Sequence, residues 1–574
     1  MKKYFSKIIL LVLLLLISTV SYGKTIVSNY FVGINNSAIL ENVKNQLASK
    51  QQEIISEPAT TEMVTAFYEV APAEIKKALQ PFGYFRAKVT TDLSRKGGVW
   101  QAIFKIDLGR PLTITFLDVS IYGDGANNLI FKDFLKRIPL KIGSILNTEQ
   151  YKAIKQQFFD LAFNNGYLYA NIDKNAIRID LQKYTAVVIL HFNTGVRYKF
   201  GKTHFATDIF DESFLRRFLT FKEGDFYTTQ QILNSQENLT NSAFFNEVNI
   251  NPEPRLAYNY AVPLEVKLTP RKSKQYDFGL GYGTDTGVRA LLGLEMRYLT
   301  KSGQHMKSFI KASRVQQDVE AHYLIPGKNP TTDQYDFSGA YERINQNYGD
   351  SSAFKVGAGY TTNIFKNWQE TIRLGLQQER YNVQNKPKRN SLYLIPSYNV
   401  MHVITDDPIQ PKRGSRINFN VQGAMEQLIG NSSFLQAQLD TKYMFPLTSV
   451  NIVILRGTIG YTAIKDLNSL PLSLQYFAGG TQTVRGYGYN SLGPGKDLLI
   501  GSAELRQKVI QNWYLAAFFD AGNTNDSFSM KLKRGVGVGI AWLSPVGTME
   551  LTYTKALDNP GRPGMVQFNM GPEF

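Results

Sequence analysis

The sequence predicts a multidomain protein in which three small α+β domains precede a 16-stranded antiparallel transmembrane β-barrel. Three observations carry this prediction. The second half repeats segments of alternating apolar and polar residues, the first half repeats a short turn motif, and aromatic residues make up 13% of the chain beside 45 glycines. Alternation with a period of two and one apolar face is typical of a strand that lies between lipid and a lumen.

Length and composition narrow the classes of protein. A chain of 574 residues is too long for one hydrophobic core and should hold several domains. The chain has no cysteine, which excludes disulfides and thiolate metal sites. The formal charge of +17 is spread along the chain without a nucleic-acid-binding motif, so we expect no nucleic-acid partner.

The first residues have the pattern of a signal peptide. Lys2, Lys3 and Lys7 precede an apolar run over residues 8–17, and small residues follow near Gly23. This run is shorter than the roughly 20 residues that a membrane-spanning helix needs. We therefore expect residues 1–23 to be a cleaved signal peptide, and a chain in a membrane would then have to cross it as a closed barrel.

A turn motif recurs in the first half of the chain. Residues 83–89 read Gly-Tyr-Phe-Arg-Ala-Lys-Val, residues 166–172 read Gly-Tyr-Leu-Tyr-Ala-Asn-Ile, and residues 243–246 occupy the corresponding place in a degraded third copy. Each copy follows a helical pattern and precedes a strand pattern, and glycine suits the left-handed residue that ends a helix. Each unit is therefore strand, helix, helix, strand, strand, over roughly 80 residues.

This order of elements resembles the POTRA domain. We expect three tandem copies, at residues 24–108, 109–194 and 195–270; unrelated small α+β domains are the alternative. The resemblance implies periplasmic domains that steer unfolded chains by adding a strand to an exposed sheet edge.

From Gln275 onward, alternating segments replace the helical patterns, and we expect a barrel over residues 271–574. In the first segment, Phe278 and Leu280 face one way while Gly279 and Gly281 face the other. Sixteen segments follow this rule, an even number as in bacterial single-chain barrels. We expect strands near 275–284, 288–299, 304–313, 317–325, 335–344, 353–362, 370–380, 392–402, 415–424, 433–445, 450–463, 498–508, 512–521, 535–543, 547–555 and 565–574.

The last expected strand alternates up to a terminal Phe574. Among outer-membrane barrels, a terminal aromatic residue after such alternation resembles the signal that the assembly machinery recognises. The first and last strands should also form a weak seam, because Gly571 packs poorly and Pro572 donates no ladder hydrogen bond. We therefore expect a lateral gate at this seam, with Gly281, Gly571 and Phe574 as its candidate residues.

The longest connection between strands, from about Ala463 to Leu498, contains Val484, Arg485, Gly486 and Tyr487 in succession. Together with the POTRA-like units and the barrel, this motif resembles the signature of the POTRA-barrel superfamily that assembles or translocates proteins at outer membranes. The resemblance implies that the loop folds back into the lumen as a lid.

The same resemblance implies that Arg485 meets acidic residues on the inner wall, for which Glu504 and Asp520 are the candidates. Alternation independently directs Glu504 and Asp520 into the lumen, opposite apolar neighbours. An arginine in a partly dehydrated lumen must be paired, and its planar group suits carboxylates. The alternative is a solvated Arg485 on the outer surface. A stripe of glycines could leave room for the loop; it comprises Gly535, Gly537 and Gly539.

Within the superfamily, three POTRA-like units before one barrel most resemble the TamA family, the outer-membrane subunits of translocation and assembly modules. The resemblance implies insertion or translocation of outer-membrane proteins, autotransporters among them, in the outer membrane of a Gram-negative bacterium. It implies as partners a TamB-like inner-membrane-anchored protein, unfolded outer-membrane clients and outer-membrane lipids. A two-partner secretion transporter and a BamA-like insertase are the alternatives.

An enzyme and a passive porin are rivals from other classes. The sequence offers no Gly-x-Ser-x-Gly elbow. Its five histidines lack ligand or triad spacing and are expected at the surface or in an aromatic girdle; they are His191, His204, His305, His322 and His402. We therefore expect no enzyme activity, no cofactor and no metal site. A porin would not need three periplasmic modules.

Overall fold

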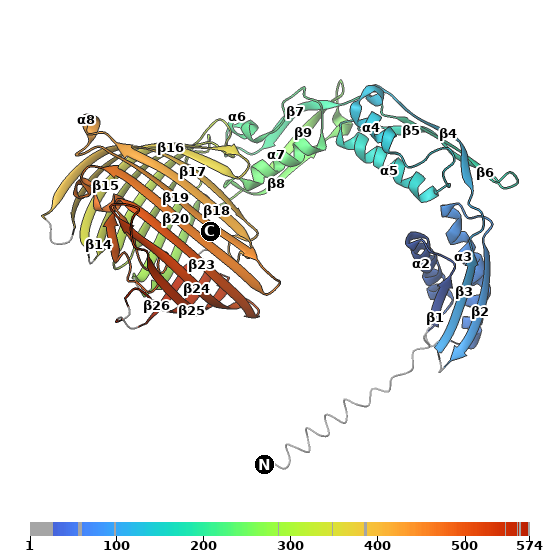
Figure 1. Cartoon of the computed structure of the whole chain (residues 1–574). Helices are drawn as coiled ribbons and strands as arrows, with labels where there is room; N and C mark the ends of the chain where they lie inside the picture. The colour runs from blue at the N-terminus through green and yellow to red at the C-terminus, as the bar shows by residue number, and fades with distance from the viewer. Residues whose placement is uncertain are drawn as a thin grey trace, which may run out of the picture. The chain divides into compact units, whose positions relative to one another are not determined.

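The computed structural model describes residues 27–55, 60–96, 99–284, 286–346, 348–383, 387–545, 547–559, 561 and 564–571 (Figure 1). The predicted signal peptide, Pro572 and Phe574 lie outside the described residues. The chain divides into two compact units. The first comprises the residues up to 202 with 222–231 and 252–264, and the second comprises 203–221, 232–251 and 265–574.

Three small domains precede the barrel, and each has the predicted order strand, helix, helix, strand, strand. In the first they are β1 (Val27–Val32), α2 (Ser37–Ile54), α3 (Thr61–Leu79), β2 (Lys88–Lys96) and β3 (Val99–Asp107). In the second they are β4 (Thr113–Tyr122), α4 (Leu129–Arg137), α5 (Thr148–Asn164), β5 (Asn171–Asp180) and β6 (Thr185–Asn193). In the third they are β7 (Lys199–Ala206), α6 (Glu212–Leu215), α7 (Thr229–Asn241), β8 (Phe245–Pro252) and β9 (Ala261–Pro270).

The three domains share one sheet topology, in which the last strand lies in the middle. The sheet orders are β1-β3-β2, β4-β6-β5 and β7-β9-β8. Helices start where a side chain can accept from free backbone N–H groups: Asn36 does so for α2 and Asn147 for α5. In the second domain, the buried rings of Phe158 and Phe192 stack at 4.2 Å and hold the helices against the sheet. Among the described residues, no helix is long and apolar enough to cross a bilayer.

The repeated glycine joins consecutive domains. Gly83 and Gly166 have φ of +86° and +87°, the left-handed conformation that the motif predicts. The carbonyl of Gly83 accepts from Leu112 N–H at 2.9 Å, and that of Gly166 accepts from Tyr198 N–H at 2.8 Å. A Cβ at Gly83 would lie 2.7 Å from the Leu146 carbonyl oxygen. The glycine therefore follows the second helix of one domain, and its carbonyl accepts from the residue just before the first strand of the next domain.

The sixteen predicted strands are confirmed as one antiparallel sheet that curls into a nearly closed barrel (Figure 1). They are β10 (Lys274–Gly283), β11 (Gly287–Met296), β12 (His305–Ala312), β13 (Gln316–Pro326), β14 (Gln334–Gln346), β15 (Gly349–Phe365), β16 (Trp368–Val383), β17 (Arg389–Thr405), β18 (Gly414–Ala424), β19 (Phe434–Pro446), β20 (Asn451–Ile464), β23 (Asp497–Ile510), β24 (Trp513–Asn525), β25 (Lys533–Ser544), β26 (Gly547–Ala556) and β27 (Met565–Gly571). Each pairs with the next in this order.

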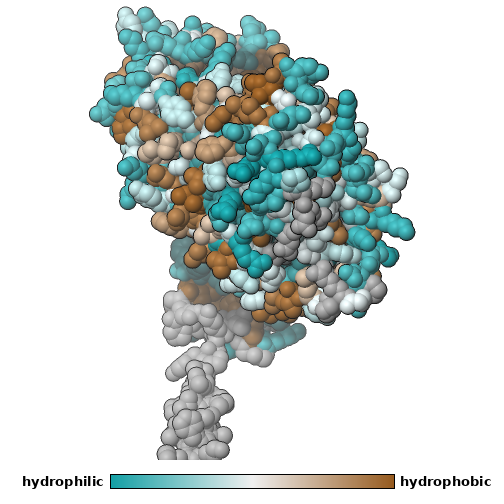
Figure 2. Space-filling model, turned by 90° about the vertical axis from the view of Figure 1, so that its left-hand side faces the viewer, coloured by the Kyte–Doolittle hydropathy of each residue, from teal (hydrophilic) through white to brown (hydrophobic). Residues whose placement is uncertain are grey.

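Outward side chains of the barrel are apolar and exposed. On β10, Phe278 is 79% exposed and Leu280 is 78% exposed. Figure 2 shows such apolar residues exposed in patches on one side of the molecule. An apolar surface of this extent is unusual for a protein in water and marks a surface that another apolar phase covers.

The ladder does not close. Across the described residues, no backbone pairing joins β10 to β27, the two ends of the sheet. The seam is bridged by Phe568 N–H, which donates to Thr284 Oγ1 at 3.4 Å, and by the rings of Tyr282 and Phe568, 6.5 Å apart. The predicted weak seam is therefore present, and it runs along the whole described length of β27.

Part of the third domain rests on the barrel within the second unit. The ring of Phe214 lies against Gly303 in the connection between β11 and β12, and Asp211 N–H donates to the Lys301 carbonyl at 2.9 Å. Arg217 donates to the Pro326 carbonyl at 3.0 Å, at the end of β13, and to the Lys328 carbonyl at 3.4 Å, in the connection between β13 and β14. These two connections therefore lie at the end of the barrel that contacts the third small domain.

The histidines make local contacts, and one differs from the expectation. His191 lies 2.7 Å from Asp118, His322 lies 3.0 Å from Asp336, and His402 stacks on a tryptophan. His305, expected at the surface or in an aromatic girdle, is instead buried at the start of β12, where its ring contacts the Gly303 carbonyl and the Gln334 side chain.

Candidate functional site: the lid loop and the seam

The connection between β20 and β23 forms a folded lid inside the barrel. Residues 465–496 contain two short 3-10 helices, η5 (Leu467–Ser469) and η6 (Leu472–Leu474), and two paired strands, β21 (Tyr476–Ala478) and β22 (Leu492–Gly495). We call this segment the lid loop. Val484 and Tyr487 of the motif are buried in one apolar cluster with Leu498 and Ile500, whose side chains line the inner wall.

The structure brings Arg485 together with both carboxylates that the motif indicates. The Arg485 side chain is buried, with 1% exposure. Its Nε donates to Asp520 Oδ2 at 2.8 Å and its Nη2 to Asp520 Oδ1 at 2.9 Å, so the pair is bidentate. Its Nη1 donates to Glu504 Oε2 at 2.6 Å. Arg485 also lies over the ring of Phe518, 3.3 Å from the ring centre.

A wider charge network surrounds this pair, and sequence reasoning missed its outer members. Glu504 Oε1 accepts from Arg506 Nε at 2.6 Å, and Glu504 Oε2 lies 4.0 Å from Arg456. Glu550 lies 3.7 Å from both Arg485 and Arg506. Alternation on β23 could have found Arg506, because it lies two residues after Glu504 and so shares its face. Buried charges of both signs therefore neutralise one another around the lid loop.

The predicted glycine stripe on β25 is occupied by this site. A Cβ at Gly535 would lie 1.9 Å from the Arg485 carbonyl oxygen, and one at Gly537 would lie 2.4 Å from the Phe518 ring. A Cβ at Gly486 would meet the backbone of β26 at 2.9 Å. Gly535 and Gly486 therefore allow the backbone of the lid loop to reach the wall. Gly537 instead makes room for the Phe518 ring under Arg485, and a Cβ at Gly539 would meet the neighbouring strand β26, not the lid loop.

A second anchor holds the other limb of the lid loop, and no motif indicated it. Glu379 on β16 is fully buried and accepts from Ser473 N–H at 3.2 Å and from Ser473 Oγ at 2.5 Å. Gln377 Nε2 donates to Glu379 Oε2 at 2.8 Å. On the next strand, Tyr393 Oη donates to the Ser469 carbonyl at 2.9 Å. The lid loop is therefore fixed to two walls of the barrel, by Arg485 on one and by Glu379 on the other.

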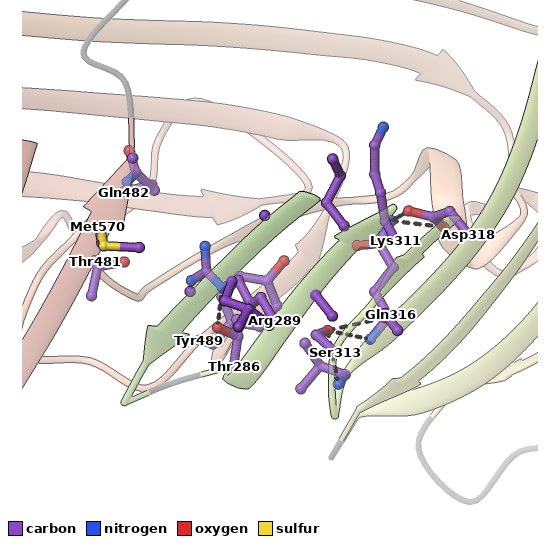
Figure 3. Close-up of a pocket in the computed structure, with 18 of the residues that line it drawn as sticks. Thr286, Arg289, Lys311, Ser313, Gln316, Asp318, Thr481, Gln482, Tyr489 and Met570 are labelled. Carbon is purple, nitrogen blue, oxygen red and sulfur yellow. Dashed lines mark hydrogen bonds between the residues drawn. The ribbon is translucent and has the colours of Figure 1, made fainter. Parts of the chain in front are cut away.

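A cavity of about 710 Å³ lies between the lid loop and the seam. In Figure 3, Met570 of the last strand and Thr481 of the lid loop lie on one side, while Arg289 and Asp318 of the first strands lie on the other. The gate candidates Gly281 and Gly571 line this cavity. The third candidate, Phe574, lies outside the described residues.

The lid loop also contacts the last strand directly. Gly486 N–H donates to Gln567 Oε1 at 3.1 Å, and Gln567 is 2% exposed. The residue that follows Arg485 thus holds β27, one of the two strands at the seam. The position of the lid loop and the position of the seam strand are therefore coupled through one backbone group.

Comparison with family models identifies three regions of the chain. Residues 272–574 match a model described as the Omp85 superfamily domain. Residues 32–108 match one described as POTRA domain TamA domain 1. Residues 198–271 match a POTRA model described as surface antigen variable number repeat.

Among curated proteins, the chain is similar to two proteins named outer membrane protein assembly factor BamA. That of Neisseria meningitidis serogroup B is 22% identical over 595 residues, covering 89% of this chain and 72% of the relative. That of Nitratidesulfovibrio vulgaris is 21% identical over 395 residues, covering 62% of this chain and about half of the relative, 49%.

Among solved structures, the chain is similar to BamA from Haemophilus ducreyi lacking POTRA domains 1–3. The TM-score is 0.67 at 17% identity, with 79% of this chain and 99% of that chain covered. At this identity the likeness extends to the fold alone.

Proposed function

We propose that this chain, which belongs to the Omp85 superfamily, assembles or translocates proteins at the outer membrane of a Gram-negative bacterium, with its POTRA domains in the periplasm. Two relatives carry the name of outer membrane protein assembly factors. The apolar outward face of the barrel supports a place in a bilayer, since a lipid-facing strand needs such side chains. The function requires no catalytic group, cofactor or metal ion, only pairing of polypeptide strands.

The observation that carries this proposal is the open ladder between β10 and β27. Unpaired backbone groups in lipid cost several kcal/mol each, roughly, so an open seam stabilises any strand that pairs with it. An incoming outer-membrane protein supplies such a strand. The cavity between the lid loop and the seam gives that strand space on the lumen side.

The activity is tested with vesicles that contain the purified full-length chain. A urea-unfolded outer-membrane barrel is diluted into these vesicles, and its folding is followed by the faster migration of folded barrels in unheated gels. We expect the client to fold faster than in empty vesicles. Equal rates with and without the chain would contradict the proposal.

We further propose a TamA-type role, with a TamB-like inner-membrane-anchored partner, autotransporter clients and contact with outer-membrane lipids. The match of residues 32–108 to the TamA-type POTRA model favours it. A BamA-like insertase and a two-partner secretion transporter are the competing roles.

In-cell photocrosslinking from Asp92, an exposed residue on the edge strand β2, separates these roles. A crosslink to a TamB-like protein supports the TamA-type role. A crosslink to other assembly-machinery subunits supports a BamA-like insertase, and one to a secreted exoprotein supports two-partner secretion.

A further inference from the structure

The outer wall of the barrel opens locally between β17 and β18. The ladder of these strands stops at Ser397 and Gln422, although β17 continues to Arg389 and stays paired with β16 up to that residue. Pro396 stands where the ladder stops, and proline has no N–H to donate to a neighbouring strand. Residues 389–396 of β17 therefore separate from the hairpin formed by β18 and β19.

The separation leaves an apolar groove of about 730 Å³ on the outer face. Outward side chains of four strands line it, and the short helix α8 (Glu426–Ile429) of the hairpin contributes Leu428. The groove is lined on its apolar side by Leu374, Leu394, Pro396, Val421, Leu428 and Leu435. Leu428 is 70% exposed. Asn431 Oδ1 accepts from Leu392 N–H at 2.7 Å, which fixes the hairpin beside β17.

The outward side chains change character along β16 towards its link to β17. Leu374 and Leu376 lie beside the groove, the exposed Gln378 follows, and the exposed Arg380 comes next. Lys388, in the connection that follows β16, is also exposed. The hairpin on the other side of the groove carries the acidic Glu426. Arg380 is therefore on the β16 side of the groove, six residues along the strand from the lining residue Leu374.

This order of apolar groove, polar residue and cation matches an anionic amphiphile. Hydrocarbon fills an apolar groove, and Arg binds phosphate oxygens with its planar donors. The groove lies at the end of the barrel opposite the connections that contact the POTRA domain, because β17 and β18 are joined by one of the connections on the POTRA side. In the membrane orientation proposed above, that end meets the outer leaflet.

We propose that this groove binds one acyl chain of a phosphate-bearing lipid of the outer leaflet, with the headgroup phosphate at Arg380 and Lys388. The inference rests on the proposed membrane location.

The test uses the full-length protein in phosphatidylcholine vesicles that contain a trace of phosphatidylglycerol with a photoreactive group in one acyl chain. Val421→Trp fills the groove, and Leu428→Asp makes the wall that α8 contributes polar at a residue that is 70% exposed. The matched control is Val356→Trp, which places the same side chain on the outward face of β15 at a residue that is 54% exposed. Unheated gels verify that each barrel is folded.

We expect labelling in the wild type to concentrate on residues 392–398 and 421–435. It should fall about tenfold in Val421→Trp and Leu428→Asp, the effect of excluding roughly two methylene groups, and stay unchanged in Val356→Trp. Arg380→Glu should reduce labelling by this probe but not by a photoreactive diacylglycerol, which has no phosphate.

Labelling spread evenly over all outward strands, or unaffected by the two groove variants, would overturn the lipid site while leaving the membrane location intact. If the protein does not float with the vesicles and no strand is labelled, the membrane location and the lipid site are both overturned.

Discussion

Arg485 donates three hydrogen bonds to Asp520, from its backbone N–H, its Nε and its Nη2, and both residues are almost completely buried. Removing one partner of such a buried pair typically costs about 3–5 kcal/mol, because the remaining charges stay buried. We expect Arg485→Ala to lower the free energy of unfolding in vesicles by this amount, as measured by urea titration. The lid loop should then become accessible to protease.

The pairing itself is measured by a double-mutant cycle of Arg485→Ala with Glu504→Ala and with Asp520→Ala. We expect coupling energies of about 1–3 kcal/mol, since the partners share one network. The matched control is the exposed pair of Arg534 and Asp558, 2.9 Å apart, for which we expect a much smaller coupling energy because water screens both charges. Strict additivity at Arg485 would show that the network carries no energy.

The sequence predicted the centre of this network but not its periphery. Arg485 was indicated by the motif, and Glu504 and Asp520 by alternation on adjacent strands. Glu379 could not be found in this way, because its partner Ser473 lies in a loop whose path across the lumen has no periodic pattern. A buried carboxylate on a strand shows only that something must contact it, not what.

At the scale of elements, the two limbs of the lid loop are held independently. Glu379→Gln keeps the size of the side chain but replaces one accepting oxygen by an NH₂ group. The groups that donate to Glu379, from Ser473 and Gln377, then face another donor, so hydrogen bonds are lost. We expect faster hydrogen exchange in residues 467–475 and unchanged exchange around Arg485. Equal acceleration in both limbs would contradict two independent anchors and show that the lid loop moves as one body.

The joints between POTRA domains give a second prediction at this scale. Alanine at Gly83 or Gly166 combines a strained positive φ with a Cβ that meets the next domain, at 2.7 Å and 2.5 Å. We expect each to destabilise its joint by more than about 1 kcal/mol, seen as faster hydrogen exchange in the loops on both sides.

Gly143 and Gly224 are the controls for the joints, because their φ values of +88° and +91° are similar but nothing lies within 4 Å of an added Cβ. Alanine at these positions reports the cost of the positive φ alone. Equal effects at all four glycines would show that the joints make no contribution beyond backbone strain.

The existence of the sixteen strands was predictable, since each carries the period of two over most of its length. The ends of these strands were harder to predict. The strand expected at 353–362 runs over Gly349–Phe365, because residues 349–352 are small or polar and continue the ladder without an apolar face. Ladder hydrogen bonds extend a strand into such residues once its neighbours are in place.

At the scale of the whole molecule, the open seam depends on how sixteen tilted strands meet, which no local pattern encodes. Gly571 and Pro572 predicted a weak pairing; the structure has no ladder between β10 and β27 at all across its described residues. The domain order and the sheet order followed from repeats and alternation, whereas the open seam is visible only in the three-dimensional arrangement of the strands.

The central claim is that client strands enter through this seam, and a reversible lock tests it most directly. The chain has no native cysteine, so cysteines introduced at Tyr282 and Phe568, whose rings face each other, or at Gly281 and Asn569, form the only disulfide. The control lock joins Asn420 to Gln438, which are already paired inside the sheet. Client folding is followed in vesicles before and after reduction. We predict that the seam lock slows folding to the rate in empty vesicles, that reduction restores it, and that the control lock has no effect. A locked seam that folds its client as fast as the reduced protein would contradict the account.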